Sequence, residues 1–128
     1  MAGRASVWLV AGFVISSFGC AKEEPPKVVE PTAAEIEQAK AVYEDQSCGI
    51  CHGDTADGGD IGPALSNMTP YWDVERLIAY LREPDAFREA NPDFEERRDR
   101  AYDEMEMPAY DMLPDEDARV LARWLLTR

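Results

Sequence analysis

Three side chains that can bind a cofactor lie within five residues of this chain, in the order Cys48-Gly49-Ile50-Cys51-His52. Two thiols three positions apart lie on one side of a helical turn, where each can form a thioether with a haem vinyl group. The adjacent imidazole then supplies a nitrogen ligand to the iron. The spacing predicts one covalently attached c-type haem, with Cys48 and Cys51 as its thioether residues and His52 as the proximal ligand.

Other uses of these side chains fit the sequence less well. A zinc site needs about four ligands, but the chain has one histidine, and its third cysteine, Cys20, lies near the N-terminus. Such a site would have to recruit carboxylates. A thioredoxin-like dithiol belongs to a βαβ setting, and no strand pattern is visible here. A structural disulfide between Cys48 and Cys51 leaves the adjacent His52 without an explanation.

The second axial ligand follows from the histidine count. Because His52 is the only histidine, two-histidine coordination within this chain is excluded, and a methionine becomes the natural distal ligand. A soft, neutral thioether favours ferrous over ferric iron and so raises the reduction potential. Four methionines follow the N-terminal segment: Met68, Met105, Met107 and Met112. Met107 is the best candidate because Pro108 fixes the backbone directly after it, and Met105 is the alternative.

Length and charge limit what the chain can do. With 128 residues and a formal net charge of −13, it has room for one domain, and its surface repels nucleic acid. The carboxylates either keep a small domain soluble or steer it toward redox proteins with basic docking surfaces. The second interpretation requires the negative charge to cluster around the haem edge.

The N-terminal segment has the pattern of an export signal. Residues 1–19 carry one positive charge followed by an uncharged apolar stretch. Cys20, with small residues on either side, resembles the acceptor cysteine of a bacterial lipoprotein. We therefore expect a signal peptide over residues 1–19, and a lipid-anchor cysteine with a flexible linker over residues 20–31. Ordinary cleavage and an uncleaved anchor are the alternatives. Each of the three places the domain outside the cytoplasm, in the periplasm or at the outer face of a bacterial membrane.

Helical periodicity predicts an all-α domain over residues 32–128. Thr32 and Glu35 form a capping-box signature ahead of a first helix that ends at about Ser47. A second amphipathic helix is expected to begin at a Thr69 cap and to stop at Pro84.

The rest of the domain is less regular until its last helix. Residues 53–67 are rich in glycine, aspartate and proline, which is typical of loops. The charged residues 85–104 are expected to form loop, short helix or both. After Pro114, three acidic residues and an apolar period predict a C-terminal helix. Three or four short helices bury only a thin core, which a haem would complete.

From about Ala33 to Leu126 the chain resembles the class I c-type cytochromes, with the family's motifs in the same order. The matching stretches are Ala39 to Gly53 for the first helix and haem site, Gly62-Pro63-Ala64-Leu65 for the Gly-Pro-x-Leu loop, Leu77 to Pro84 for the middle helix, Met107-Pro108 for the distal ligand loop, and Leu121 to Leu125 for the last helix.

That resemblance implies the cytochrome c fold and several contacts within it. It implies that the imidazole N–H of His52 donates to the Pro63 carbonyl, which orients the ring. It also implies haem contacts from Leu65 and Tyr110. At the crossing of the first and last helices it implies a pair of aromatic rings, Tyr43 and Trp124, with Ala39 where the family often has glycine.

Together these features predict a one-electron carrier, not an enzyme, that works as a monomer with respiratory or other redox proteins. The alternative is a haem sensor or peroxidase-like protein with a weak or open sixth coordination site. A peroxidase typically needs a distal histidine with arginine, and the chain has no second histidine. A subunit or docking module of a larger respiratory complex would use the same chemistry with a permanent partner.

Overall fold

The computed structural model describes residues 27–69, 71–98, 100–102 and 105–128, and within these ranges it is all-helical, as predicted. The predicted signal peptide (residues 1–19), Cys20 and the first part of the linker lie outside the described residues. The helices are α1 (Ala33–Asp45), α2 (Gly49–His52), α3 (Val74–Arg82), α4 (Pro84–Ala90), α5 (Pro92–Arg97) and α6 (Asp115–Leu126), with a 3₁₀ turn η1 (Arg100–Tyr102). No described helix has the length and apolar character that crossing a membrane requires.

The first helix starts as predicted and ends in a motif that the sequence analysis missed. The Glu35 N–H donates to Thr32 Oγ1 at 3.3 Å, and the Thr32 N–H donates to the Glu35 carboxylate at 2.8 Å, which completes the capping box. At the other end the N–H of Cys48 reaches the Tyr43 carbonyl at 3.0 Å, and the N–H of Ser47 reaches the Glu44 carbonyl at 2.9 Å. This is a Schellman motif with Ser47 in the left-handed region, at φ 59°. It turns the chain from α1 directly into Cys48.

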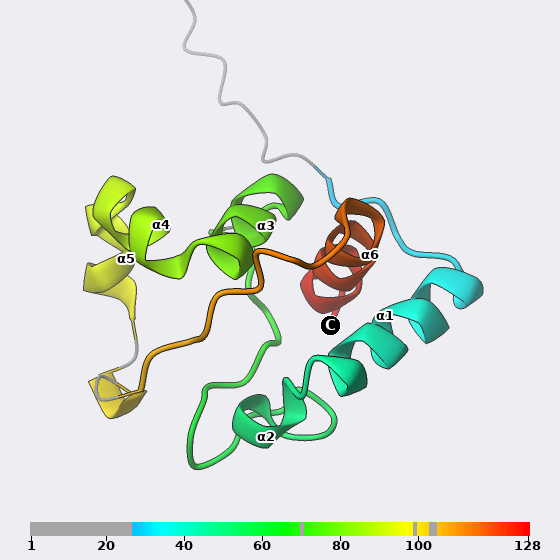
Figure 1. Ribbon diagram of the computed structural model, residues 1–128, viewed down its shortest axis with the longest axis horizontal. Coiled ribbons are helices and arrows are strands. Elements are labelled where there is room, and N and C mark those ends of the chain that lie inside the picture. Colours follow the sequence, from blue (N-terminus) through cyan, green and yellow to red (C-terminus); the bar gives the residue numbers. More distant parts are fainter. Residues whose placement is uncertain (1–26, 70, 99, 103–104) are drawn as a thin grey trace, which may run out of the picture.

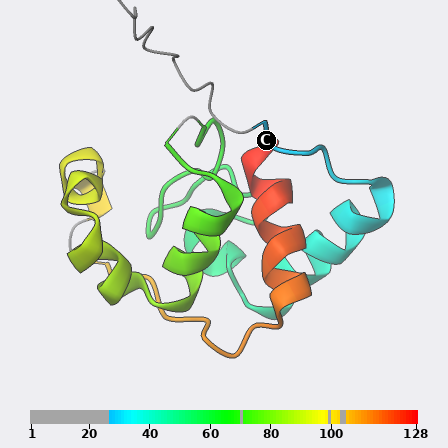
Figure 2. The ribbon, with the colours of Figure 1, turned by 90° about the horizontal axis from the view of Figure 1, so that it is seen from above.

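The last helix is the shared partner of α1 and α3, and it packs against both (Figures 1 and 2). Its buried side chains extend around most of its circumference: Ala118, Val120, Leu121, Ala122, Trp124, Leu125 and Leu126. At the α1–α6 crossing Ala39 is fully buried, and the rings of Tyr43 and Trp124 meet edge to face with centroids 5.5 Å apart. The expected aromatic pair is therefore present.

The second predicted helix begins later than expected. The Thr69 cap is wrong, because α3 starts at Val74 and its N-cap is Asp73, whose carboxylate accepts the Arg76 N–H at 2.8 Å. Pro70, expected in the first turn, lies outside the described residues. Tyr71 and Trp72 precede the helix; Tyr71 packs against Phe94 of α5 and Trp72 against Phe87 of α4. Tertiary packing of these two rings outweighs the local capping signal.

Residues 85–104, left open between loop and helix, contain α5, most of α4 and the 3₁₀ turn, so the described part has more helices than the three or four expected. Pro84 and Pro92 each lie in the first turn of a new helix. Proline is tolerated there because the backbone N–H groups of a first turn have no acceptor within the helix. Five rings, which we call the aromatic cluster, fix these helices to α3: Tyr71, Trp72, Tyr80, Phe87 and Phe94. Phe87 and Phe94 are both buried within it.

Candidate functional site

The predicted site residues line one cavity of about 660 Å³. Small-molecule and cofactor sites usually measure roughly 300–1,000 Å³ and are mostly apolar. The lining surface here is mostly apolar, and α3, α5, α6 and the loops contribute these apolar side chains to it: Ile61, Leu65, Trp72, Leu77, Leu81, Phe94 and Leu125. The predicted residues among the lining are Cys48, Cys51, His52, Pro63, Leu65, Met105, Met107 and Tyr110. Residues more than fifty positions apart in the chain therefore meet at one site.

The short helix α2 carries the two thiols and the imidazole. The Cys48 carbonyl accepts the N–H of Cys51 at 3.2 Å and the N–H of His52 at 2.9 Å, so all three belong to one turn. Both cysteines are free thiols in the structure. Cys48 is buried, and that burial raises the pKa of its thiol. The two sulfur atoms are not joined to each other and remain available for bonds to a cofactor.

The imidazole of His52 is oriented by one backbone carbonyl. Nδ1 lies 2.8 Å from the Pro63 oxygen, and because a carbonyl only accepts, Nδ1 carries the proton and donates it. In the neutral ring with this tautomer, Nε2 has no proton and is the nitrogen able to bind a metal. A hydrogen bond of this kind fixes the ring and makes Nε2 a stronger donor to iron.

Two glycines allow the backbone to close around this histidine, a role that the sequence analysis did not assign. A Cβ at Gly62 would lie 3.0 Å from Nδ1 of His52. Gly53 adopts φ +79°, and a Cβ there would lie 2.7 Å from the Gly58 oxygen. The loop can press against the imidazole only where these side chains are absent. The sequence could have indicated this role, because each of the two glycines is next to a predicted haem-site residue.

The four methionines differ in their relation to the cavity. Met107 is half-buried and packs against the hydrophobic core, whereas Met105, also in the lining, is 48% exposed. Met68 lines the cavity from the loop that carries Pro63. Met112 is 87% exposed and does not line it. Burial therefore favours Met107 over Met105.

The donor set fits an attached haem better than a zinc ion. Within the described ranges no group of three or more His, Cys, Asp and Glu side chains gathers closely enough to hold a metal ion. Two free thiols and one oriented imidazole instead face a large cavity with a mostly apolar lining. This arrangement suits a bulky, apolar cofactor that brings its own iron.

Comparison with known proteins gives two matches. The family model described as Cytochrome c matches residues 36–128. Cytochrome c oxidase subunit 2 from Alkalihalophilus pseudofirmus is 29% identical over 107 residues, which cover 77% of this chain and 27% of that protein. The chain thus matches only about a quarter of the length of that curated relative. No solved structure gives a significant match.

Tyr43 connects the α1–α6 crossing to the backbone beside His52. Its hydroxyl donates to the Gly53 oxygen at 2.7 Å. Burial, with nearby acidic groups as lesser causes, raises the pKa of Tyr43 to about 12 from the ordinary 10.0. The folded state therefore favours the neutral phenol.

Tyr43→Phe is expected to lower the free energy of unfolding by about 1 kcal/mol at neutral pH, because the Gly53 oxygen loses its donor. The raised pKa adds a pH dependence. The stability that the neutral phenol contributes is complete below pH 10, where both states keep the proton, and it is lost as the pH rises toward 12. Denaturant unfolding of the haem-loaded protein should show a steeper fall over this window in the wild type than in the variant. Equal slopes would contradict the prediction.

Proposed function

Because the chain belongs to the cytochrome c family, whose members carry covalently bound haem c and transfer electrons, we propose that it is a one-electron carrier working outside the cytoplasm. Cys48 and Cys51 form the thioethers, and His52 and Met107 are the axial ligands. One observation carries this assignment: His52, oriented by Pro63 at 2.8 Å, lines the same cavity as Met107. Met105 is the alternative distal residue.

Bound haem c supplies a couple between ferric and ferrous iron that takes up or releases one electron. The chain's own residues keep the two axial donors in place and keep water away. The Pro63 carbonyl holds the proton on Nδ1 of His52 and leaves Nε2 free to bind. Leu65 and Tyr110 line the cavity and would contact the haem, and Leu77 and Leu81 add apolar lining. A site that changes little between oxidation states suits transfer of single electrons and needs no bound substrate.

Charge on the segments that bear the ligands supports a basic redox partner. Residues 41–69 contain five carboxylates and residues 105–118 contain five more, and neither segment contains lysine or arginine. Asp57, Glu106 and Asp115 are paired with arginines from other segments. Ile50, on the first of these acidic segments, lines the cavity and is nevertheless 74% exposed. An exposed apolar side chain on a segment with five carboxylates and no lysine or arginine fits a protein whose own contact surface is basic.

The curated relative, which is by name a subunit of cytochrome c oxidase, supports a respiratory partner. From that name we propose only the class of partner for this chain, which is a respiratory electron donor or acceptor. The domain acts as a monomer, attached to the outer face of a bacterial membrane by a lipid on Cys20 after removal of residues 1–19. The linker that follows, up to residue 31, lets the domain reach its partners.

Met107→Ala is expected to remove the methionine–iron charge-transfer band of the ferric protein, to lower the reduction potential and to let cyanide bind at once, because the iron loses its thioether ligand. Absorption spectroscopy and a redox titration measure these changes. Met105→Ala and Met112→Ala are matched controls that should keep the band. Loss of the band in Met105→Ala alone would make Met105 the ligand. A wild-type protein that lacks the band and binds cyanide at once would favour the open-site sensor or peroxidase-like alternative.

Electron transfer to a lysine-rich redox protein is expected to slow as salt is added, because the attraction between the two surfaces is screened. Asp54, exposed and close to Gly49 of α2, is a suitable probe. Asp54→Asn should lower the stopped-flow rate at low salt about twofold. Glu89→Gln, an equal change of charge on the exposed surface of α4, should leave the rate unchanged. Equal effects of both variants would mean that net charge alone steers the encounter.

Cys20→Ser is expected to move the protein from the membrane fraction to the soluble fraction, because the residue that would accept the lipid is gone. Mass spectrometry of the wild-type N-terminal peptide should show a chain that starts at an acylated Cys20. A wild-type peptide that starts at an unmodified Cys20, or that still includes residues 1–19, would contradict lipidation.

A further inference from the structure

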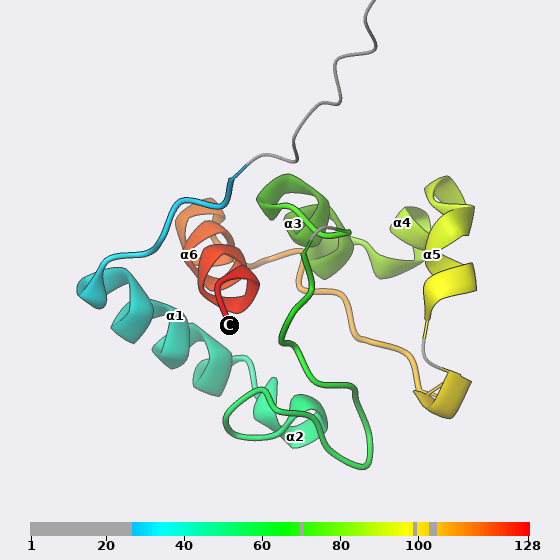
Figure 3. The ribbon, with the colours of Figure 1, turned by 180° about the vertical axis from the view of Figure 1, so that it is seen from behind.

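The segment that carries Met107 has no helix of its own to hold it. Residues 105–114 connect the 3₁₀ turn to α6 and are irregular throughout (orange in Figures 1 and 3). The N–H of Leu113 donates to the Tyr110 carbonyl at 3.1 Å, a bond within the segment. The N–H of Tyr110 donates to the Leu81 carbonyl of α3 at 2.8 Å. The C-terminal end of α3 therefore holds the second half of this segment. At its start, the N–H of Met105 donates to the Tyr102 carbonyl at 3.1 Å, and Glu106 pairs with Arg88 of α4 at 3.7 Å.

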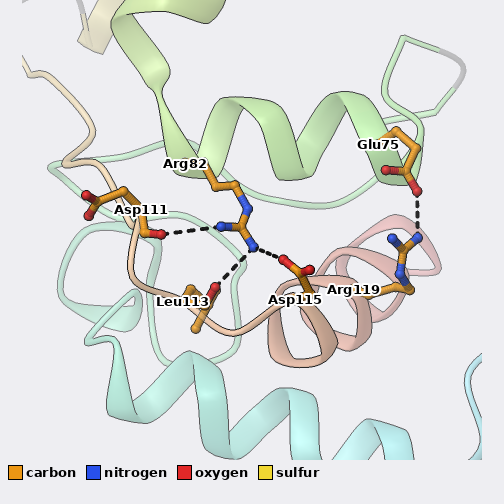
Figure 4. Close-up of polar contacts among 6 residues, drawn as sticks. All are labelled: Glu75, Arg82, Asp111, Leu113, Asp115 and Arg119. Atoms are coloured by element: carbon orange, nitrogen blue, oxygen red, sulfur yellow. Dashed lines mark hydrogen bonds and ion pairs between the residues drawn. The ribbon is translucent and has the colours of Figure 1, made fainter.

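Arg82, the last residue of α3, reaches the same segment with its side chain (Figure 4). Its guanidinium donates to the Asp111 carbonyl at 3.3 Å and to the Leu113 carbonyl at 3.1 Å. It also pairs with the carboxylate of Asp115, the first residue of α6, at 2.5 Å. The Arg82 side chain is only 28% exposed. A planar, charged fork of donors is suited to hold several acceptors at once.

A second ion pair between α3 and α6 allows a direct comparison. Glu75, in the first turn of α3, pairs with Arg119 of α6 at 2.5 Å (Figure 4). Both side chains are largely exposed, at 71% and 44%. This pair joins the same two helices, but each of its members belongs to a helix and neither is hydrogen-bonded to residues 105–114. The Glu75–Arg119 pair thus bridges α3 and α6 as the Arg82–Asp115 pair does, but it has no hydrogen bonds to residues 105–114.

We propose that Arg82 is a positioning residue for the distal axial ligand, acting by holding residues 111–115 against the end of α3. Two of its acceptors are main-chain carbonyls four and six positions after Met107, so the bonds restrain the backbone itself. Pro108 adds stiffness directly after the methionine. The backbone hydrogen bond between Tyr110 and Leu81 does not depend on the Arg82 side chain. Loss of that side chain therefore loosens the segment but does not detach it from α3. This proposal rests on the axial role proposed for Met107.

The test compares Arg82→Gln, Arg82→Lys and the control Glu75→Gln in the full-length, haem-loaded protein. Cyanide replaces an axial methionine only when the segment that carries it opens, so its binding rate to the ferric protein reports that opening. Arg82→Gln should bind cyanide about tenfold faster, since it loses hydrogen bonds from a charged group. It should also show a weaker methionine–iron band and a lower reduction potential. Arg82→Lys should give values between those of the wild type and Arg82→Gln, because one ammonium group cannot donate to all three acceptors.

Glu75→Gln should keep the wild-type cyanide rate, band and potential, even where its melting temperature falls. The proposal is overturned by an Arg82→Gln protein that behaves like Glu75→Gln, or by full restoration in Arg82→Lys, which would assign the effect to charge alone. If Arg82→Gln fails to take up haem, the comparison of Arg82→Lys with Glu75→Gln decides in the same way. A wild-type band that Met107→Ala does not change overturns the ligand assignment and this proposal together. A band lost in Met107→Ala but unchanged in the Arg82 variants overturns this proposal alone.

Discussion

The packing of α6 against both α1 and α3 is the contact on which the rest of the structure depends. Leu121 and Val120 are the largest side chains that are fully buried, and both come from α6. With α6 between them, α1 and α3 cannot shift independently, because close-packed interiors transmit displacement instead of absorbing it. The end of α1 leads into the thiols and the imidazole, and the end of α3 holds the segment that carries Met107. The α6 contacts therefore fix the two halves of the site relative to each other.

The walls of the cavity come from parts of the chain that have little stability alone. Helix α2 is a single turn, and the loop after it is held by backbone bonds such as that from Gly58 to the His52 carbonyl at 2.8 Å. On another side, Trp72, Tyr80 and Phe94 belong both to the aromatic cluster and to the cavity lining. The charged stretch of α4 and α5 thus contributes apolar rings toward the interior, while Asp85, Glu89 and Glu96 remain exposed to water. A covalently held haem in this cavity would contact these walls and would stabilise them together.

The sequence by itself determined the features that depend on near neighbours in the chain. The thiols and imidazole of Cys48, Cys51 and His52 lie on one turn because their spacing is short. The capping box at Thr32 and Glu35 is likewise a contact across three residues. The last helix was predictable because its acidic start and apolar period are both local. The family followed from the order of such local motifs, and the match over residues 36–128 confirms it.

The tertiary structure alone decided the features whose partners lie far along the chain. The start of α3 moved from Thr69 to Asp73 because the rings of Tyr71 and Trp72 pack against later helices. The helices within residues 85–104 have weak local signals, and buried contacts of Phe87 and Phe94 stabilise them. Arg82 acts across 29 to 33 residues, and no local pattern marks which arginine will find main-chain acceptors. Local spacing specifies the chemistry of an element, whereas the position of that element depends on surfaces that meet only after the chain has folded.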